Sequence, residues 1–170
     1  MVINISELQN NPGIKAWFYT SEGVALMLGS FLVKYINRKL SNYTIIFSFS
    51  FVVALAHLLL YFSSSSFISI LAFSLFGFAA GSLFPTAYTI FQKEIPKHFH
   101  GRFFSFKNMV DRIVFQVVLL STGFFLDVIG LENMNLLFGF ISIVCTLTLL
   151  NKFKRAKLTE REVQKNLFTG

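Results

Sequence analysis

The stretch that most constrains this chain is residues 67–91, a run of 25 consecutive uncharged and mostly apolar residues. About 20 apolar residues are enough for a helix to cross the hydrocarbon core of a bilayer, so this run can cross with some tilt. Similar runs recur along the chain, and only 14% of all residues are charged, against about 25% in soluble domains. These features predict an all-α, polytopic membrane protein and exclude a soluble globular domain.

The apolar runs divide into five expected transmembrane helices, separated by short polar turns. Residues 1–13 are polar and end in an Asn-Pro-Gly sequence, which predicts an extracytoplasmic segment before the first helix. Ser41 or Asn42 can cap the second helix, and residues 151–170 form a basic cytoplasmic tail, expected as a surface helix or a disordered segment. The expected helices span residues 14–36, 43–62, 67–91, 106–128 and 134–150.

The basic residues lie almost entirely in alternate gaps between the apolar runs. Such a bias orients a membrane protein with its basic turns in the cytoplasm. On the opposite side, Lys15 is the one basic residue, and Glu7, Asp127 and Glu132 lie there too. We therefore expect a multi-pass protein of the cell membrane with its N-terminus outside and its C-terminus in the cytoplasm. The expected cytoplasmic basic residues are Lys34, Arg38, Lys39, Lys93, Lys97, Arg102, Lys107, Lys152, Lys154, Arg155 and Lys157.

The third expected helix has one face of small or weakly polar side chains. Gly77 and Gly81 are four residues apart, so a neighbouring backbone can approach this face closely. Pro85 frees a backbone carbonyl and tends to kink the helix, which membranes tolerate when neighbours or water satisfy that carbonyl. Tyr88 continues the stripe. The pattern leaves two alternatives open, a face that borders substrate and a face that packs against another helix.

Glu22 is an acidic residue near the middle of the first expected helix. An acidic side chain there costs about 2.5 to 3.5 kcal/mol on insertion scales, so some compensation is required. One compensation is protonation, since a carboxyl group can take up and release a proton as its surroundings dry and wet. Tyr19, three residues earlier, is placed to hydrogen-bond it. Two roles stay open for Glu22: a proton-coupling or cation-binding carboxylate, and an acid paired with a basic residue of another helix for packing.

Polar and charged residues also open the fourth expected helix. Lys107 and Asp111 are four residues apart, as are Asn108 and Arg112, so each pair is placed to interact along the helix. Arg112 and Gln116 begin a partly polar stripe. This stripe either faces a water-filled path or lies at the membrane interface, where long charged side chains reach back into water.

Several segments resemble the major facilitator superfamily of secondary transporters. Residues 29–39, GSFLVKYINRK, are similar to the cytoplasmic turn between paired helices of these carriers, with Val33 at the position of an acid and Ile36 at that of a second glycine. Residues 77–102 resemble a glycine-rich helix with a mid-span proline that leads into the next helix. Residues 122–130, TGFFLDVIG, resemble the end of the penultimate helix.

The resemblance implies that the five helices correspond to the eighth to twelfth of a twelve-helix carrier, most similar to bacterial drug and macrolide efflux members. It also implies that the third expected helix lines the central cavity. The candidate cavity-lining residues are Gly77, Gly81, Pro85, Tyr88, Asp111, Arg112 and Gln116. The candidate residues of a cytoplasmic gating turn are Gly29, Lys34, Arg38 and Lys39.

Two function hypotheses follow. In the first, the chain is the C-terminal portion of a proton-coupled drug efflux carrier that takes a small, amphipathic drug as substrate. It is then inactive alone, because the N-terminal half of the transporter and one further helix are absent. In the second, the chain is a self-standing five-helix membrane protein that binds or assembles with partners and transports nothing.

The expected partners are therefore the lipid bilayer, a small-molecule substrate and the missing transporter half. The sequence has no glycine-rich phosphate loop, no nucleophile and base pair and no metal-ligand spacing. We expect no enzymatic activity, no cofactor and no metal. We also expect no nucleic-acid partner, since topology accounts for the positive charge.

Overall fold

The computed structural model describes the backbone of residues 12–63 and 65–169, and the side chains in these ranges other than 131, 132, 152 and 154–169. Gly130, with φ 75° and ψ 166°, interrupts the last helix, so that helix has a first part, residues 100–129, and a second part, residues 131–169. Five helices in the described ranges are long and apolar enough to cross a membrane. This confirms the all-α, multi-pass architecture. The elements are α2 (Pro12–Ile36), α3 (Asn42–Tyr61), α4 (Ser66–Glu94), η1 (Lys97–Phe99) and α5 (His100–Thr169).

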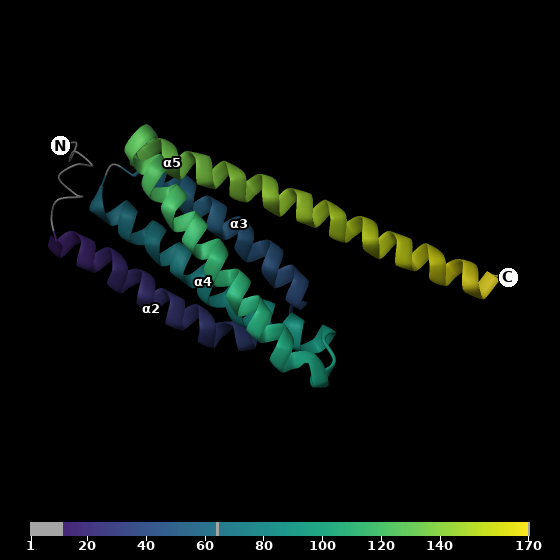
Figure 1. Ribbon diagram of the computed structural model, residues 1–170. Helices are drawn as coiled ribbons and strands as arrows, with labels where there is room; N and C mark the ends of the chain where they lie inside the picture. The colour runs from purple at the N-terminus through teal and green to yellow at the C-terminus, as the bar shows by residue number, and fades with distance from the viewer. Residues whose placement is uncertain (1–11, 64, 170) are drawn as a thin grey trace.

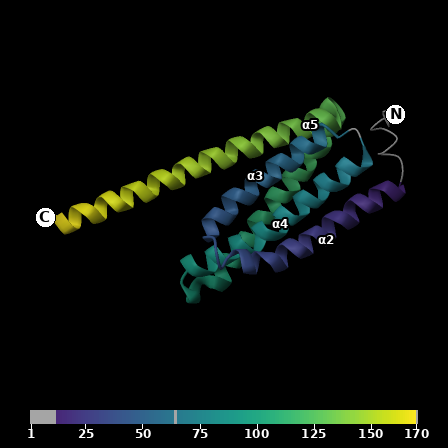
Figure 2. The same ribbon diagram turned by 180° about the vertical axis from the view of Figure 1, so that it is seen from behind.

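The helices run back and forth between two ends of a bundle (Figure 1). α2 lies along α4, α4 lies along α3, and the second part of α5 lies along α3, as the view from behind also shows (Figure 2). The first part of α5 crosses the front of the bundle, and the end of the second part projects beyond it. The helices therefore follow the order α2, α4, α3 and the second part of α5, with α4 between α2 and α3.

Several helix ends differ from the sequence-based expectation. The last helix continues to Thr169, so the tail expected from residue 151 as a surface helix or a disordered segment extends the fifth span. Pro12 and Gly13, expected in a loop, form the first turn of α2, because the fixed φ and missing N–H of proline suit a helix start. α4 continues to Glu94 rather than 91. α5 begins at His100 rather than 106, since after Pro96 the chain needs only the single turn of η1 to resume a helix. Residues 1–11 of the expected N-terminal segment lie outside the described residues.

Serine side chains form the caps of α3 and α4. The Ser41 hydroxyl accepts a hydrogen bond from the Thr44 N–H at 3.2 Å, so Ser41 is the cap of α3 and Asn42 is its first residue. Ser65 caps α4 in the same way through the Ile68 N–H. These caps satisfy amide groups that have no intrahelical partner.

α2 and α4 cross with their backbones in direct contact. A Cβ atom on Gly77 would collide with the carbonyl oxygen of Glu22, and one on Gly81 with the carbonyl oxygen of Leu26. Gly29 of α2 approaches the backbone of α4 in the same way. Only glycine permits this approach, and such small-residue contacts replace a hydrophobic core in helices that pack within lipid.

Aromatic rings contribute to the contact between α3 and the second part of α5. The ring of Phe153 lies 4.6 Å from that of Tyr43 and 5.6 Å from that of Phe47. The Nδ1 atom of His57 donates a hydrogen bond to the Val53 carbonyl oxygen of its own helix at 2.9 Å, and the His57 ring meets that of Phe138 edge-on. His57 is therefore a packing residue of this contact.

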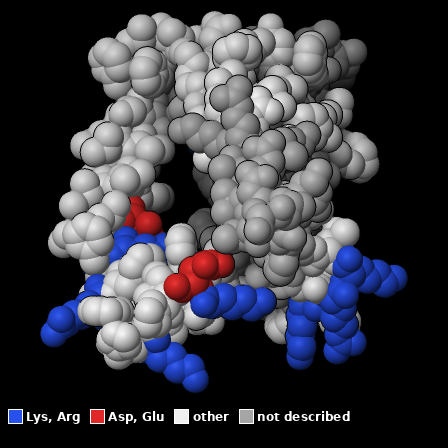
Figure 3. Space-filling model, turned by 90° about the vertical axis from the view of Figure 1, so that its right-hand side faces the viewer, with Lys and Arg blue, Asp and Glu red and all other residues white. Residues whose placement is uncertain are grey.

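The first part of α5 is separate from the rest of the bundle along most of its length. No residue from 95 to 130 is buried. Figure 3 shows this helix as a column on the left, divided from the other helices by an open gap and joined to them at both ends. On this face the Lys and Arg side chains gather at the lower end, where α2 ends and α5 begins. We call this the basic end of the bundle.

The glycine contact predicts opposite effects for one substitution at two sites. Gly81→Ala should lower the free energy of unfolding by about 1 to 3 kcal/mol, because the new methyl group forces the two backbones apart. Gly123→Ala, in open space on α5, should leave it unchanged or raise it by up to about 1 kcal/mol, since alanine favours a helix. Unfolding of the purified protein in detergent micelles measures both, and equal effects would contradict the packing.

Candidate functional site

Pro85 creates an unpaired carbonyl in α4, and a serine of α2 satisfies it. Because proline has no N–H, the carbonyl oxygen of Gly81, four residues earlier, lacks its usual helical donor. The Ser30 hydroxyl lies 3.0 Å from this oxygen and 2.9 Å from the Leu26 carbonyl of its own helix. Of the two expected ways to satisfy the freed carbonyl, a neighbouring group or water, the structure shows the first, and Ser30 is that group.

Ser82 makes the reciprocal contact from α4 to α2. Its hydroxyl lies 3.3 Å from the Gly29 carbonyl oxygen and 3.0 Å from that of Phe78 in its own helix. The Ser82 side chain is fully buried. Each helix therefore presents a serine hydroxyl to a glycine carbonyl of the other, which fixes how far α2 and α4 can slide.

Glu22 lies at the same crossing, on the side nearer to the start of α2. Its carbonyl contacts Gly77, and its side chain is half-buried. Among the described residues, no hydrogen bond or salt bridge joins the Glu22 carboxylate to another side chain. Tyr19 is 67% exposed and its ring meets that of Phe73 edge-on at 6.3 Å, with no hydrogen bond to Glu22 in the described ranges. Glu22 is thus a carboxyl within a membrane-spanning helix that has no described basic partner.

Tyr88 joins α4 to the start of α5. Its hydroxyl donates a hydrogen bond to the Asn108 side-chain oxygen at 3.2 Å, and its ring stacks on that of Phe104 at 5.6 Å. The amino group of Lys107 lies 4.8 Å from the centre of the Tyr88 ring and forms a salt bridge with Asp111. The expected Lys107–Asp111 pair is confirmed, whereas Asn108 pairs with Tyr88 of α4.

The remaining polar residues of the first part of α5 lie on a helix that no other described helix covers. Asp111, Arg112 and Gln116 are all exposed. Asp111 is placed near Tyr88 through Lys107, so these two candidate cavity residues belong to one cluster. That Asp111, Arg112 and Gln116 line a substrate path stays a prediction.

The expected gating turn is divided between two places. Gly29 lies within the membrane-spanning part of α2, buried against α4. Lys34 is in the last turn of α2, and Arg38 and Lys39 follow in a tight turn in which their N–H groups bond the carbonyls of Tyr35 and Ile36 at 3.2 and 3.0 Å. A gating role stays a prediction for these residues.

The structure therefore places the candidates in two groups, one at the α2–α4 crossing and one at the basic end. The first holds Glu22 with Gly77 and Gly81, and the second holds Tyr88 with Asp111. Sequence reasoning missed Ser30, although a freed carbonyl four residues before Pro85 could be located from the sequence. The donor could not, because it depends on which helix lies alongside.

The described ranges contain no cluster of side chains that could bind a metal ion. Within them, no group of three or more His, Cys, Asp or Glu side chains is placed to hold a metal ion. The Nε2 atom of His100 lies 2.8 Å from the Ile95 carbonyl oxygen, and the His98 ring lies 4.2 Å from that of Phe99. Both histidines thus make local contacts at the start of α5.

Comparison with known proteins gives one match. The family model of the Major Facilitator Superfamily matches residues 2–168. No curated protein and no solved structure matches the chain. The match covers all the described membrane-spanning helices, including both candidate groups.

The Ser30–Gly81 hydrogen bond predicts that Ser30 and Pro85 are energetically coupled. Ser30→Ala should lower the free energy of unfolding by about 1 to 2 kcal/mol, because it leaves a buried carbonyl without a donor. In a Pro85→Ala background the same change should cost clearly less, since residue 85 then supplies the missing N–H. A double-mutant cycle in detergent micelles measures this coupling.

Ser74→Ala is the matched control for this cycle. The Ser74 hydroxyl bonds only the Ile70 carbonyl of its own helix, at 2.8 Å, so its removal leaves no carbonyl unsatisfied. It should change stability little in either background. Additive effects of Ser30→Ala and Pro85→Ala would show that Ser30 does not replace the proline N–H.

Proposed function

Since this chain belongs to the major facilitator superfamily, a family of membrane transporters, we propose that it forms the C-terminal portion of a proton-coupled drug efflux carrier. In this proposal its five spans correspond to the eighth to twelfth helices of a twelve-helix transporter. The remaining helices come from another part of the carrier, and the substrate is a small amphipathic drug. Its place is the cell membrane, with the basic end in the cytoplasm.

The proposal of proton coupling depends on the surroundings of Glu22. It is a half-buried carboxyl in a membrane-spanning helix, and no basic side chain pairs with it in the described part of the chain. A carboxyl that served only packing would need such a partner, because an uncompensated charge in lipid is costly. A proton is the simplest compensation, and its release on exposure to water couples transport to a proton gradient.

The uncovered first part of α5 supports the proposal of a larger carrier. Alternating access requires two helix bundles that move against one another around a site near the midplane. Asp111, Arg112 and Gln116 lie on the helix that stands apart from the bundle across the open gap in Figure 3. In the assembled carrier we place these three side chains, with Tyr88 and Pro85 of α4, along the substrate path between the two bundles.

The charge distribution supports the proposed orientation. Lys34, Arg38 and Lys93 lie at one end of the bundle, next to the start of α5. Basic residues near the ends of membrane spans are retained on the cytoplasmic side. The start of α2 lies at the opposite end of the bundle (Figure 1), which this proposal assigns to the outside of the cell.

Glu22→Gln should abolish proton-coupled efflux while leaving the protein folded. Cells that carry the substitution at the native locus should extrude ethidium no faster than cells lacking the gene, because glutamine cannot carry the proton. Wild-type extrusion should collapse when a protonophore removes the gradient. Fluorescence of intracellular ethidium follows both.

Asp127→Asn is the control, since it removes an exposed carboxylate at the end of the first part of α5. Its extrusion rate should match the wild type. Undiminished, gradient-dependent extrusion by the Glu22→Gln strain would refute the assignment of Glu22.

The partial-carrier proposal predicts that the isolated chain does not transport. Vesicles that contain the purified chain alone should show no ethidium flux under an imposed proton gradient, because the five helices provide only one side of the substrate path. Gradient-driven flux in these vesicles would overturn the partial-carrier assignment. Flux in wild-type cells without flux in these vesicles is the expected combination.

A further inference from the structure

A cavity of about 600 Å³ lies at the basic end of the bundle. It is open to the outside, and three helix ends border it: the end of α2 with its following turn, the start of α3 and the last turn of α4. Its volume falls within the range of about 300 to 1,000 Å³ that is typical of small-molecule sites. The cavity is distinct from the Glu22 crossing and from the Tyr88 cluster, whose residues do not line it.

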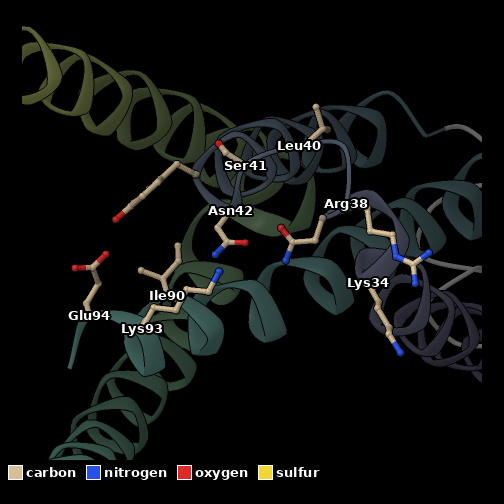
Figure 4. A pocket seen from close by; sticks show the side chains of 10 residues that line it. Lys34, Arg38, Leu40, Ser41, Asn42, Ile90, Lys93 and Glu94 are labelled. Carbon is tan, nitrogen blue, oxygen red and sulfur yellow. The ribbon is translucent and has the colours of Figure 1, made fainter. Parts of the chain in front are cut away.

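The side chains around the cavity are predominantly cationic. Lys34, Arg38 and Lys93 line it, against the single carboxylate of Glu94. None of these four forms a salt bridge within the described ranges. In Figure 4 the Lys93 amino group extends toward Asn42, Glu94 lies on the far side of Lys93, and Lys34 and Arg38 lie at the opposite side of the cavity. Arg38 also lies over the Tyr35 ring, 5.5 Å from its centre. Three cations that form no salt bridge around one hollow favour an anionic occupant.

The start of α3 adds backbone donors to the same cavity. Ile45 donates the first helical hydrogen bond, to the Ser41 carbonyl at 3.0 Å, and the Ser41 hydroxyl takes the Thr44 N–H. The N–H groups of Asn42 and Tyr43 precede these bonds and have no acceptor in the described part of the chain. Free N–H groups at a helix start carry partial positive charge and bind anions such as phosphate.

The position of the cavity indicates which anion it meets. It lies at the ends of membrane-spanning helices, where the polar headgroups of a bilayer begin. Basic pockets between membrane helices at this depth bind phosphorylated headgroups. Arg38 offers a planar fork that suits phosphate oxygens, and the two lysines add charge.

We propose that this cavity binds a phosphate-bearing anion through Lys34, Arg38, Lys93 and the N-terminus of α3. A phospholipid headgroup and a soluble phosphate compound present the same chemistry to these groups. Lys34 and Arg38 also belong to the candidate gating turn, but the proposal concerns anion binding alone and does not require that this turn gates transport.

The test compares two double variants of the full purified chain in detergent micelles. Arg38→Gln/Lys93→Gln removes one arginine and one lysine from the cavity, and Lys97→Gln/Arg102→Gln removes one of each from the same end outside it. Short-chain phosphatidylglycerol is titrated into each by calorimetry. The cavity variant should bind it roughly 10- to 30-fold more weakly than wild type, since each cation near a membrane surface contributes about fivefold. The control should stay within about twofold of wild type, because the removed cations lie outside the site.

Glu94→Gln should raise the affinity for phosphatidylglycerol, whereas the cavity variant should lower it. It removes the one acid that lines the cavity, so phosphatidylglycerol should bind about fivefold more tightly. This variant also keeps the test decisive if the double cavity variant fails to fold, as judged by gel filtration.

Competition with inorganic phosphate distinguishes a phospholipid headgroup from a soluble phosphate compound. Binding of phosphatidylglycerol that millimolar inorganic phosphate does not displace identifies a lipid headgroup, and displacement identifies a soluble phosphate compound. Equal loss of binding in the cavity and control variants, or equal binding of neutral phosphatidylcholine and phosphatidylglycerol, would overturn the proposal. So would a Glu94→Gln variant that binds phosphatidylglycerol no better than wild type.

Discussion

Within lipid, every backbone carbonyl must find a donor inside the protein, and this requirement governs the contact between α2 and α4. Pro85 removes the donor for the Gly81 carbonyl, and Ser30 replaces it from the other helix at 3.0 Å. A serine hydroxyl reaches so far only because glycines let the two backbones touch. The glycines and the serine therefore depend on one another: a larger side chain at Gly81 would both separate the helices and leave the carbonyl without a donor.

The same contact divides the bundle into a tightly packed portion and a loosely attached one. α2 and α4 are joined by glycine contacts and by hydroxyl groups in both directions, whereas no residue from 95 to 130 is buried. The first part of α5 is connected through the short η1 at one end and through Gly130, in a left-handed conformation, at the other. Such an arrangement suits a transporter, in which a rigid group of helices keeps its shape while its neighbours change position around the substrate.

The sequence predicted the five apolar spans and the carbonyl freed by Pro85, but it left open whether a neighbouring group or water would satisfy that carbonyl. It also placed Lys107 and Asp111 four residues apart, which is enough to predict their salt bridge, since both lie on one helix. It could not identify Ser30 or the Tyr88–Asn108 hydrogen bond, because helical periodicity defines a face and not the helix opposite it. The start of α5 was predicted too late, at 106, since basic residues were assigned to a turn although charge does not prevent a helix outside the hydrocarbon core.

The cationic cavity and the Glu22 crossing lie on one helix but are separated along it. Lys34 follows Glu22 by twelve positions along α2, which corresponds to about 18 Å at 1.5 Å per residue. A phosphate group in the cavity is therefore too far away to contact the carboxylate, and an effect of one site on the other has to pass through α2 itself. α2 is held against α4 between these two points by the serine and glycine contacts, so an anion at the basic end acts first on the start of α3. The proposed anion binding and the proposed proton coupling are accordingly expected to be separable.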